Sequence, residues 1–108
     1  MKAKTVKEVL IAAKWILENV GWCQKAYVTT KDDKLGFDPD GSAAIGDVKA
    51  ACALGSIYMV QSDNHDLRPG AVDVLQNEVI NITNWNDDPA RTKQEVLDMF
   101  TRAIEKAS

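Results

Sequence analysis

The stretch at residues 47–60, DVKAACALGSIYMV, is the most continuously apolar run in the chain. Only Asp47 and Lys49 carry a charge, and both lie at its start. Asp47 suits the N-cap of a helix that begins at Val48, because its carboxylate accepts hydrogen bonds from free backbone N–H groups and favours the helix dipole. The remaining residues are apolar or small on all sides, which is typical of a buried helix. We therefore expect a central helix that the other helices cover.

Two helix starts carry the capping-box pattern, in which a threonine and a glutamate three residues later bond to each other's backbone N–H groups. The first helix begins at Thr5 and ends before Gly21, a natural stop. The last helix begins after Thr92. A further helix is expected over residues 69–81, where apolar residues recur at helical spacing, and residues 82–89 are expected to form a loop.

A small β-hairpin is expected within residues 25–37. Residues 26–30 are β-branched and aromatic, and residues 34–37 can pair back after a turn at Asp32 and Asp33. Four helices and this hairpin predict a mainly α, four-helix-bundle-like fold. With 108 residues and 45% hydrophobic composition, the chain suits one helical domain over residues 1–108.

The composition argues against several kinds of partner. The net charge is −3 and there is no basic block, so we expect no nucleic-acid surface. No apolar run approaches about 20 residues, so no membrane span is expected. The first residues are charged and amphipathic rather than typical of a signal peptide. Together with only two cysteines, this favours a cytoplasmic protein with free thiols.

Cys23, Cys52 and His65 are the only soft or borderline metal ligands in the sequence. None has the spacing of a metal-binding pair, so we expect no metal and no cofactor. Cys52 lies within the apolar run and resembles a small hydrophobic residue, whereas Cys23 follows a helix stop. The catalytic alternative is Cys23 acting with His65 or Asp87, as in a thiol- or carboxylate-dependent hydrolase or transferase.

Residues 85–92, WNDDPART, place an aromatic ring, an amide, two carboxylates and a guanidinium before a helix N-terminus. In a structural interpretation, Trp85 fills the core and Asn86 or Asp87 turns the chain. Arg91 then pairs with an acidic side chain. In a functional interpretation, the same four side chains form a ligand-binding surface. Both interpretations remain open at the level of sequence.

Ile11 and Trp15 lie on the side of the first helix that is opposite its apolar face. One helix face cannot bury both this pair and the main apolar stripe. Either the hairpin covers the pair within the monomer, or the chain forms a homo-oligomer through Ile11 and Trp15.

Three short elements occur in order along the chain: Gly-Trp-Cys-Gln at residues 21–24, Cys-Ala-Leu-Gly-Ser-Ile at residues 52–57, and Trp-Asn-Asp at residues 85–87 followed by Arg91 and Thr92. Together they resemble a family of small uncharacterised bacterial and phage proteins. The resemblance covers nearly the whole chain, with Ser56 where the family usually has alanine. It supports the helical architecture and implies no reaction.

The sequence favours a non-enzymatic accessory protein in the cytoplasm that binds a protein or a small ligand, because it contains no recognised catalytic arrangement. The alternative is the small enzyme described above. A third hypothesis is that clustered aspartates form an acidic surface that regulates nucleic-acid machinery; these are Asp32, Asp33, Asp38, Asp40, Asp87 and Asp88.

Overall fold

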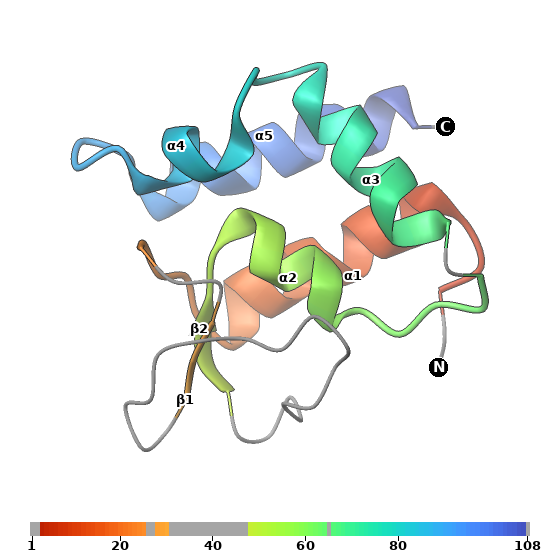
Figure 1. The fold of residues 1–108 in the computed structure, drawn as a ribbon, viewed down its shortest axis with the longest axis horizontal. Coiled ribbons are helices and arrows are strands. Elements are labelled where there is room, and N and C mark those ends of the chain that lie inside the picture. The colour runs from red at the N-terminus through yellow and green to blue at the C-terminus, as the bar shows by residue number, and fades with distance from the viewer. Residues whose placement is uncertain (1–2, 26–27, 31–47, 65, 108) are drawn as a thin grey trace.

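The computed structural model describes residues 3–25, 28–30, 48–64 and 66–107, and all structural statements below concern these residues. They form five helices and two strands (Figure 1). In chain order these are α1 (Val6–Asn19), β1 (Val28–Thr30), β2 (Val48–Ala51), α2 (Ala53–Met59), α3 (Leu67–Gln76), α4 (Ile82–Asp87) and α5 (Lys93–Lys106). The prediction of a mainly helical fold with a small antiparallel β element is confirmed.

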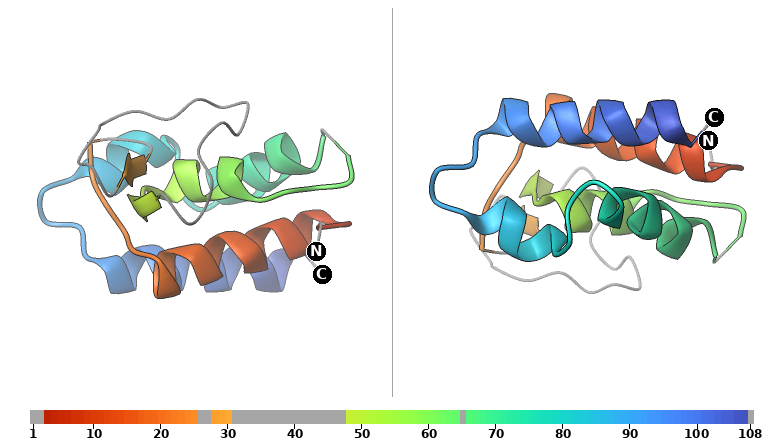
Figure 2. Two further views of the ribbon diagram at one scale, coloured as in Figure 1. Left: turned by 90° about the horizontal axis from the view of Figure 1, so that it is seen from below. Right: turned by 90° about the horizontal axis from the view of Figure 1, so that it is seen from above.

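The helices form two layers (Figure 2). In one layer α1 and α5 lie side by side and antiparallel, and the Lys93 ammonium donates to the Glu18 carbonyl at their junction. The other layer contains α2, α3 and α4. The core fills the space between them, and its largest fully buried side chains include Phe100, Leu10 and Leu17. None of the described helices combines the length and the apolar character needed to cross a membrane.

The predicted starts of the first and last helices are confirmed. The Thr5 hydroxyl accepts from the Glu8 N–H at 3.1 Å, while the Glu8 carboxylate accepts from the Lys4 N–H at 2.9 Å. At α5, Thr92 and Glu95 form a complete capping box. These bonds satisfy N–H groups that have no partner within the helix, so local sequence alone fixes both helix starts.

The central helix is shorter than predicted, because residues 48–51 form strand β2 and α2 begins only at Ala53. Ala51 is paired on both sides, with Val28 in β1 and with Trp22 in an isolated parallel bridge. Cys52 is extended and caps α2, its Sγ accepting from the Gly55 N–H at 3.2 Å. An apolar run does not distinguish a buried strand from a buried helix, which explains the error. The expected cap, Asp47, lies outside the described residues.

The first strand of the predicted β-hairpin is confirmed, and its partner among the described residues is β2. Strand β1 pairs antiparallel with β2, with Val28 opposite Ala51 and Thr29 opposite Ala50. Residues 31–47, which include the expected second strand, lie outside the described residues.

The chain between the last two predicted helices also differs from the prediction. Helix α3 ends at Gln76, and Ile80, within the range predicted for this helix, is 95% exposed. The expected loop after it is instead the short helix α4, which starts where the Asn81 side chain accepts from the Asn84 N–H at 3.0 Å. Asparagine caps a helix as well as threonine does, so this helix start is also specified by local sequence.

Gly21, which ends the first helical segment, lies directly against β2. Its φ is +152°, and a Cβ atom at this position would lie 2.7 Å from the Lys49 carbonyl oxygen and 3.3 Å from the Ala50 Cβ. The close approach lets Gly21 accept from the Ala51 N–H at 3.0 Å. Glycine is therefore required where α1 leads into the sheet.

We expect Gly21→Ala to lower the free energy of unfolding by about 2 kcal/mol or more, because the methyl group meets backbone atoms that cannot turn away. Gly70→Ala in α3 is the control, since there the methyl group meets only a Val6 side-chain methyl at 2.9 Å. It also gains helix propensity of about 1 kcal/mol. Urea unfolding followed by circular dichroism compares them, and equal effects of the two variants would contradict the account.

Candidate functional site

Asn86, near the end of α4, is a fully buried polar residue at the meeting point of three segments. Its Oδ1 accepts from the Trp22 indole N–H at 2.8 Å and from the Ala53 N–H at 3.0 Å. Its Nδ2 donates to the Cys23 carbonyl at 3.1 Å and to the Asp87 carboxylate at 3.0 Å. A carboxamide has two donor hydrogens and two acceptor lone pairs, so all its hydrogen-bonding capacity is used inside the protein.

Gln24, Lys25 and Asp87 extend this junction. The Gln24 amide donates to the Asn86 carbonyl at 3.0 Å and to the Asp88 carbonyl at 2.7 Å. The Asp87 carboxylate accepts from the Lys25 N–H at 2.8 Å, where Lys25 has a φ of +67°. The segment after α1 is therefore bound along its length to the end of α4. We call residues 21–25 together with residues 86–88 the amide junction.

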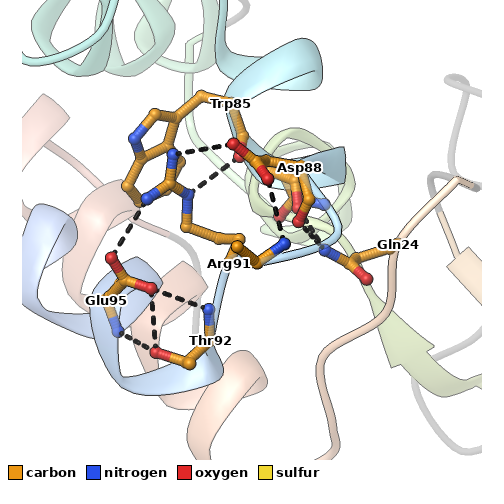
Figure 3. A network of polar contacts seen from close by, with 8 residues as sticks. Gln24, Trp85, Asp88, Arg91, Thr92 and Glu95 are labelled. Atoms are coloured by element: carbon orange, nitrogen blue, oxygen red, sulfur yellow. Dashed lines mark hydrogen bonds and ion pairs between the residues drawn. The ribbon is translucent and has the colours of Figure 1, made fainter.

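Trp85 and Arg91 form a stacked pair beside the amide junction (Figure 3). The Arg91 guanidinium lies 3.9 Å from the centre of the Trp85 ring, and its Nε donates to the Trp85 carbonyl at 2.9 Å. Its Nη1 donates to Glu95 at 3.1 Å, and its Nη2 lies 4.0 Å from the Asp88 carboxylate. The Arg91 side chain is only 17% exposed, whereas those of Asp88 and Glu95 are about half exposed.

The surroundings of Arg91 determine what this surface can attract. Hydrogen bonding from the Thr92 N–H lowers the pKa of Glu95, with further contributions from the Thr92 side chain and from Arg91. Glu95 is therefore an anion at neutral pH, and together with Asp88 it places two negative charges beside the single guanidinium charge. An incoming anion would have to displace these carboxylates, so the surface favours a cationic group.

The two thiols lie near one another on adjoining backbone segments. The Cys23 N–H donates to the Ala51 carbonyl at 3.0 Å, which sets Cys23 beside Cys52. Burial, with smaller contributions from Cys52 and Asp87, raises the pKa of Cys23 from 9.0 to about 12. Burial also raises the pKa of Cys52, although the Gly55 N–H opposes it. Both cysteines are free thiols that remain protonated at neutral pH.

A family comparison covers almost the whole of this structure. The model of a family of unknown function, DUF6197, matches residues 1–106. The chain belongs to this family. Searches of curated proteins and of solved structures give no match. The DUF6197 match spans both halves of the amide junction and both cysteines.

Two motifs that are far apart in this sequence meet in the fold. The Gly-Trp-Cys-Gln element supplies Trp22, Cys23 and Gln24, and the Trp-Asn-Asp element supplies Asn86 and Asp87. Both motifs stood out in the sequence. Nothing in the sequence indicated that they contact each other, because more than 60 residues separate them.

The residues named for catalysis are brought together in part. Cys23 lies close enough to Asp87 for the carboxylate to raise its pKa, which is opposite to the activation a nucleophile needs. His65 lies outside the described residues. Among the described residues, no group of three or more His, Cys, Asp or Glu side chains is placed to hold a metal ion.

The raised pKa of Cys23 predicts a loss of stability in alkaline solution. Above pH 9 the unfolded thiol releases its proton, while the folded thiol keeps it until about pH 12. The folded state then binds more protons than the unfolded state, so the free energy of unfolding falls as the pH rises through this window.

Chemical unfolding of the wild type and Cys23→Ser at pH 8–10.5 measures this dependence. Serine does not titrate in that range, so the variant should lose stability less steeply as pH rises. The slope is compared rather than the absolute stability, because the substitution itself changes packing. Parallel curves would show that Cys23 does not titrate as described.

Proposed function

We propose that the protein is a non-enzymatic accessory protein of the cytoplasm that binds another protein through the outer face of α1. The observation that carries this proposal is the exposure of two large apolar side chains on that face: Trp15 is 54% exposed and Ile11 is 47% exposed. They lie one helical turn apart, opposite the residues of α1 that are buried in the core.

Exposure of Trp15 and Ile11 to water is unfavourable, and burial against a partner would be favourable in free energy. Burying a large apolar side chain is worth about 1.5–3 kcal/mol, and aromatic side chains dominate the energetics of protein contacts. The remaining α1 residues of similar size, such as Leu10 and Leu17, are fully buried. An accessible tryptophan beside an isoleucine therefore supports a contact surface. The net charge of −3 supports a protein partner rather than nucleic acid.

The chemistry of the thiols supports binding over catalysis. Cys23, with a pKa of about 12, carries almost no thiolate at neutral pH, and Cys52 is 97% buried beside it. Nucleophilic catalysis requires an activated thiolate, usually beside a base or a positive charge. The nearby Asp87 has the wrong charge for this purpose and is bonded to Lys25 and Asn86.

The Trp85–Arg91 surface is a second candidate contact site. Trp85 is partly exposed, and the half-exposed carboxylates of Asp88 and Glu95 flank its stacked partner. A ligand here would contact Trp85 and Arg91, while Asn86 and Asp87 hold the surface from behind through the amide junction. Two exposed carboxylates beside an aromatic ring suit a lysine or arginine side chain of a partner.

A photoreactive residue placed in the protein tests both surfaces in cells of its source organism. We expect a specific adduct with the crosslinker at position 15. Position 88 tests the second surface, and Asp73, exposed on α3 in the opposite layer, supplies the control position.

Competition establishes specificity in this experiment. Excess co-expressed wild-type protein without the crosslinker should abolish the adduct at position 15, whereas excess co-expressed Trp15→Glu should leave it intact. If position 15 gives no more adduct than position 73, the proposal fails for α1. Competition by Trp15→Glu as efficient as by the wild type would also contradict it.

A further inference from the structure

We propose that the partner of the α1 outer face is a second copy of this chain, bound antiparallel with a twofold axis through Ile11. This inference rests on the proposed function, since it assigns an occupant to the same face. The order of charges around the apolar pair supports this arrangement. The exposed residues of this face are Lys4, Glu8, Ile11, Trp15 and Glu18, with half-buried Lys14 at its edge.

Identical helices that meet about a twofold axis contact each other through the same residues on both copies. If the helices are parallel, every residue faces its own copy. Lys4 then faces Lys4 of the partner subunit, and Glu8 and Glu18 face their own copies in the same way. Like charges that face each other in an interface are repulsive, so the charges disfavour this arrangement.

An antiparallel arrangement can place the twofold axis at the level of Ala13. Ile11 then packs against Trp15 of the partner subunit, which suits the apolar residues. The same axis sets Glu8 against Glu18 of the partner subunit, twice in each dimer. The apolar contact is therefore accompanied by two carboxylate pairs of like charge.

Moving the axis to Ile11 removes this conflict. Ile11 packs against its own copy at the centre, and Lys4 faces Glu18 of the partner subunit. Glu8 faces Lys14 of the partner subunit, and the twofold axis repeats both pairs. Trp15 then lies against the aliphatic stem and ammonium of Lys7 of the partner subunit, a favourable cation–aromatic contact. Of the three arrangements, this one alone opposes charges of unlike sign throughout.

The size of the face sets the strength of the association. One face of a 14-residue helix buries less than the roughly 1,200 Å² of a standard interface, so the dimer is weak and concentration-dependent. Its ion pairs are exposed, so added salt should weaken it further. The measurement therefore belongs at low ionic strength and high protein concentration.

A charge exchange between Lys4 and Glu18 tests the proposed axis. Sedimentation equilibrium gives the dimer dissociation constant, Kd, of the wild type, Lys4→Glu, Glu18→Lys and the double variant. Each single variant should raise Kd about three- to tenfold, because two ion pairs become two repulsive pairs. The double variant should restore Kd to the wild-type value.

Neither substitution is expected to disturb the folding of α1, so a change in Kd reports on the interface. Glutamate before α1 and lysine in its last turn both suit the helix dipole, so neither change should lower helix stability. The result also distinguishes the two axes. With the axis at Ala13, Glu18→Lys would face Glu8 of the partner subunit and lower Kd instead of raising it.

The outcomes separate this inference from the proposed function. A wild-type protein that stays monomeric at millimolar concentration and low salt overturns the dimer, as do single variants with an unchanged or lowered Kd. If a competed adduct at position 15 with a different protein accompanies such a monomer, the dimer alone fails and the contact surface stands. Loss of that adduct as well would remove both.

Discussion

The carboxamide of Asn86 is the constraint on which the rest of the structure depends. It is fully buried, and its four hydrogen bonds connect the segment after α1, the start of α2 and the end of α4. No polar side-chain atom buried in the described part of the chain lacks a partner. Removing one partner from such a network exposes the others to the full cost of an unsatisfied buried group, so the junction acts as a unit.

The parts of the fold that could be predicted are those specified by neighbouring residues. Thr5 and Thr92 start helices through bonds to residues three positions later, and such bonds are visible in sequence. Strand β2 could not be predicted in this way. Its extended form depends on Val28 and Trp22, which are distant in sequence and pair with Ala51 from both sides. The apolar run alone is compatible with either structure.

In the candidate site, too, the features specified by neighbouring residues could be predicted, and the contacts between distant residues could not. Trp85, Asn86, Asp87 and Arg91 stood out in sequence as a cluster of polar and aromatic groups. Their partners did not, because Trp22 lies 64 residues from Asn86 and Gln24 is equally remote from Asp88. The structure commits the polar groups of Asn86 and Asp87 to internal bonds. Binding is therefore left to the side chains that remain accessible, above all Trp15 on the opposite layer.

A double-mutant cycle between Trp22 and Asn86 tests the central claim most directly. Trp22→Phe removes the indole donor, Asn86→Ala removes the carboxamide, and denaturant unfolding gives the free energies of both and of the double variant. We predict a coupling energy of about 1 kcal/mol or more. As a control, the effects of Trp22→Phe and Asn84→Ala on the free energy of unfolding should be additive. Asn84 is an exposed residue of α4, the helix that contains Asn86. Additivity of Trp22→Phe with Asn86→Ala would show that the amide junction does not hold the fold together.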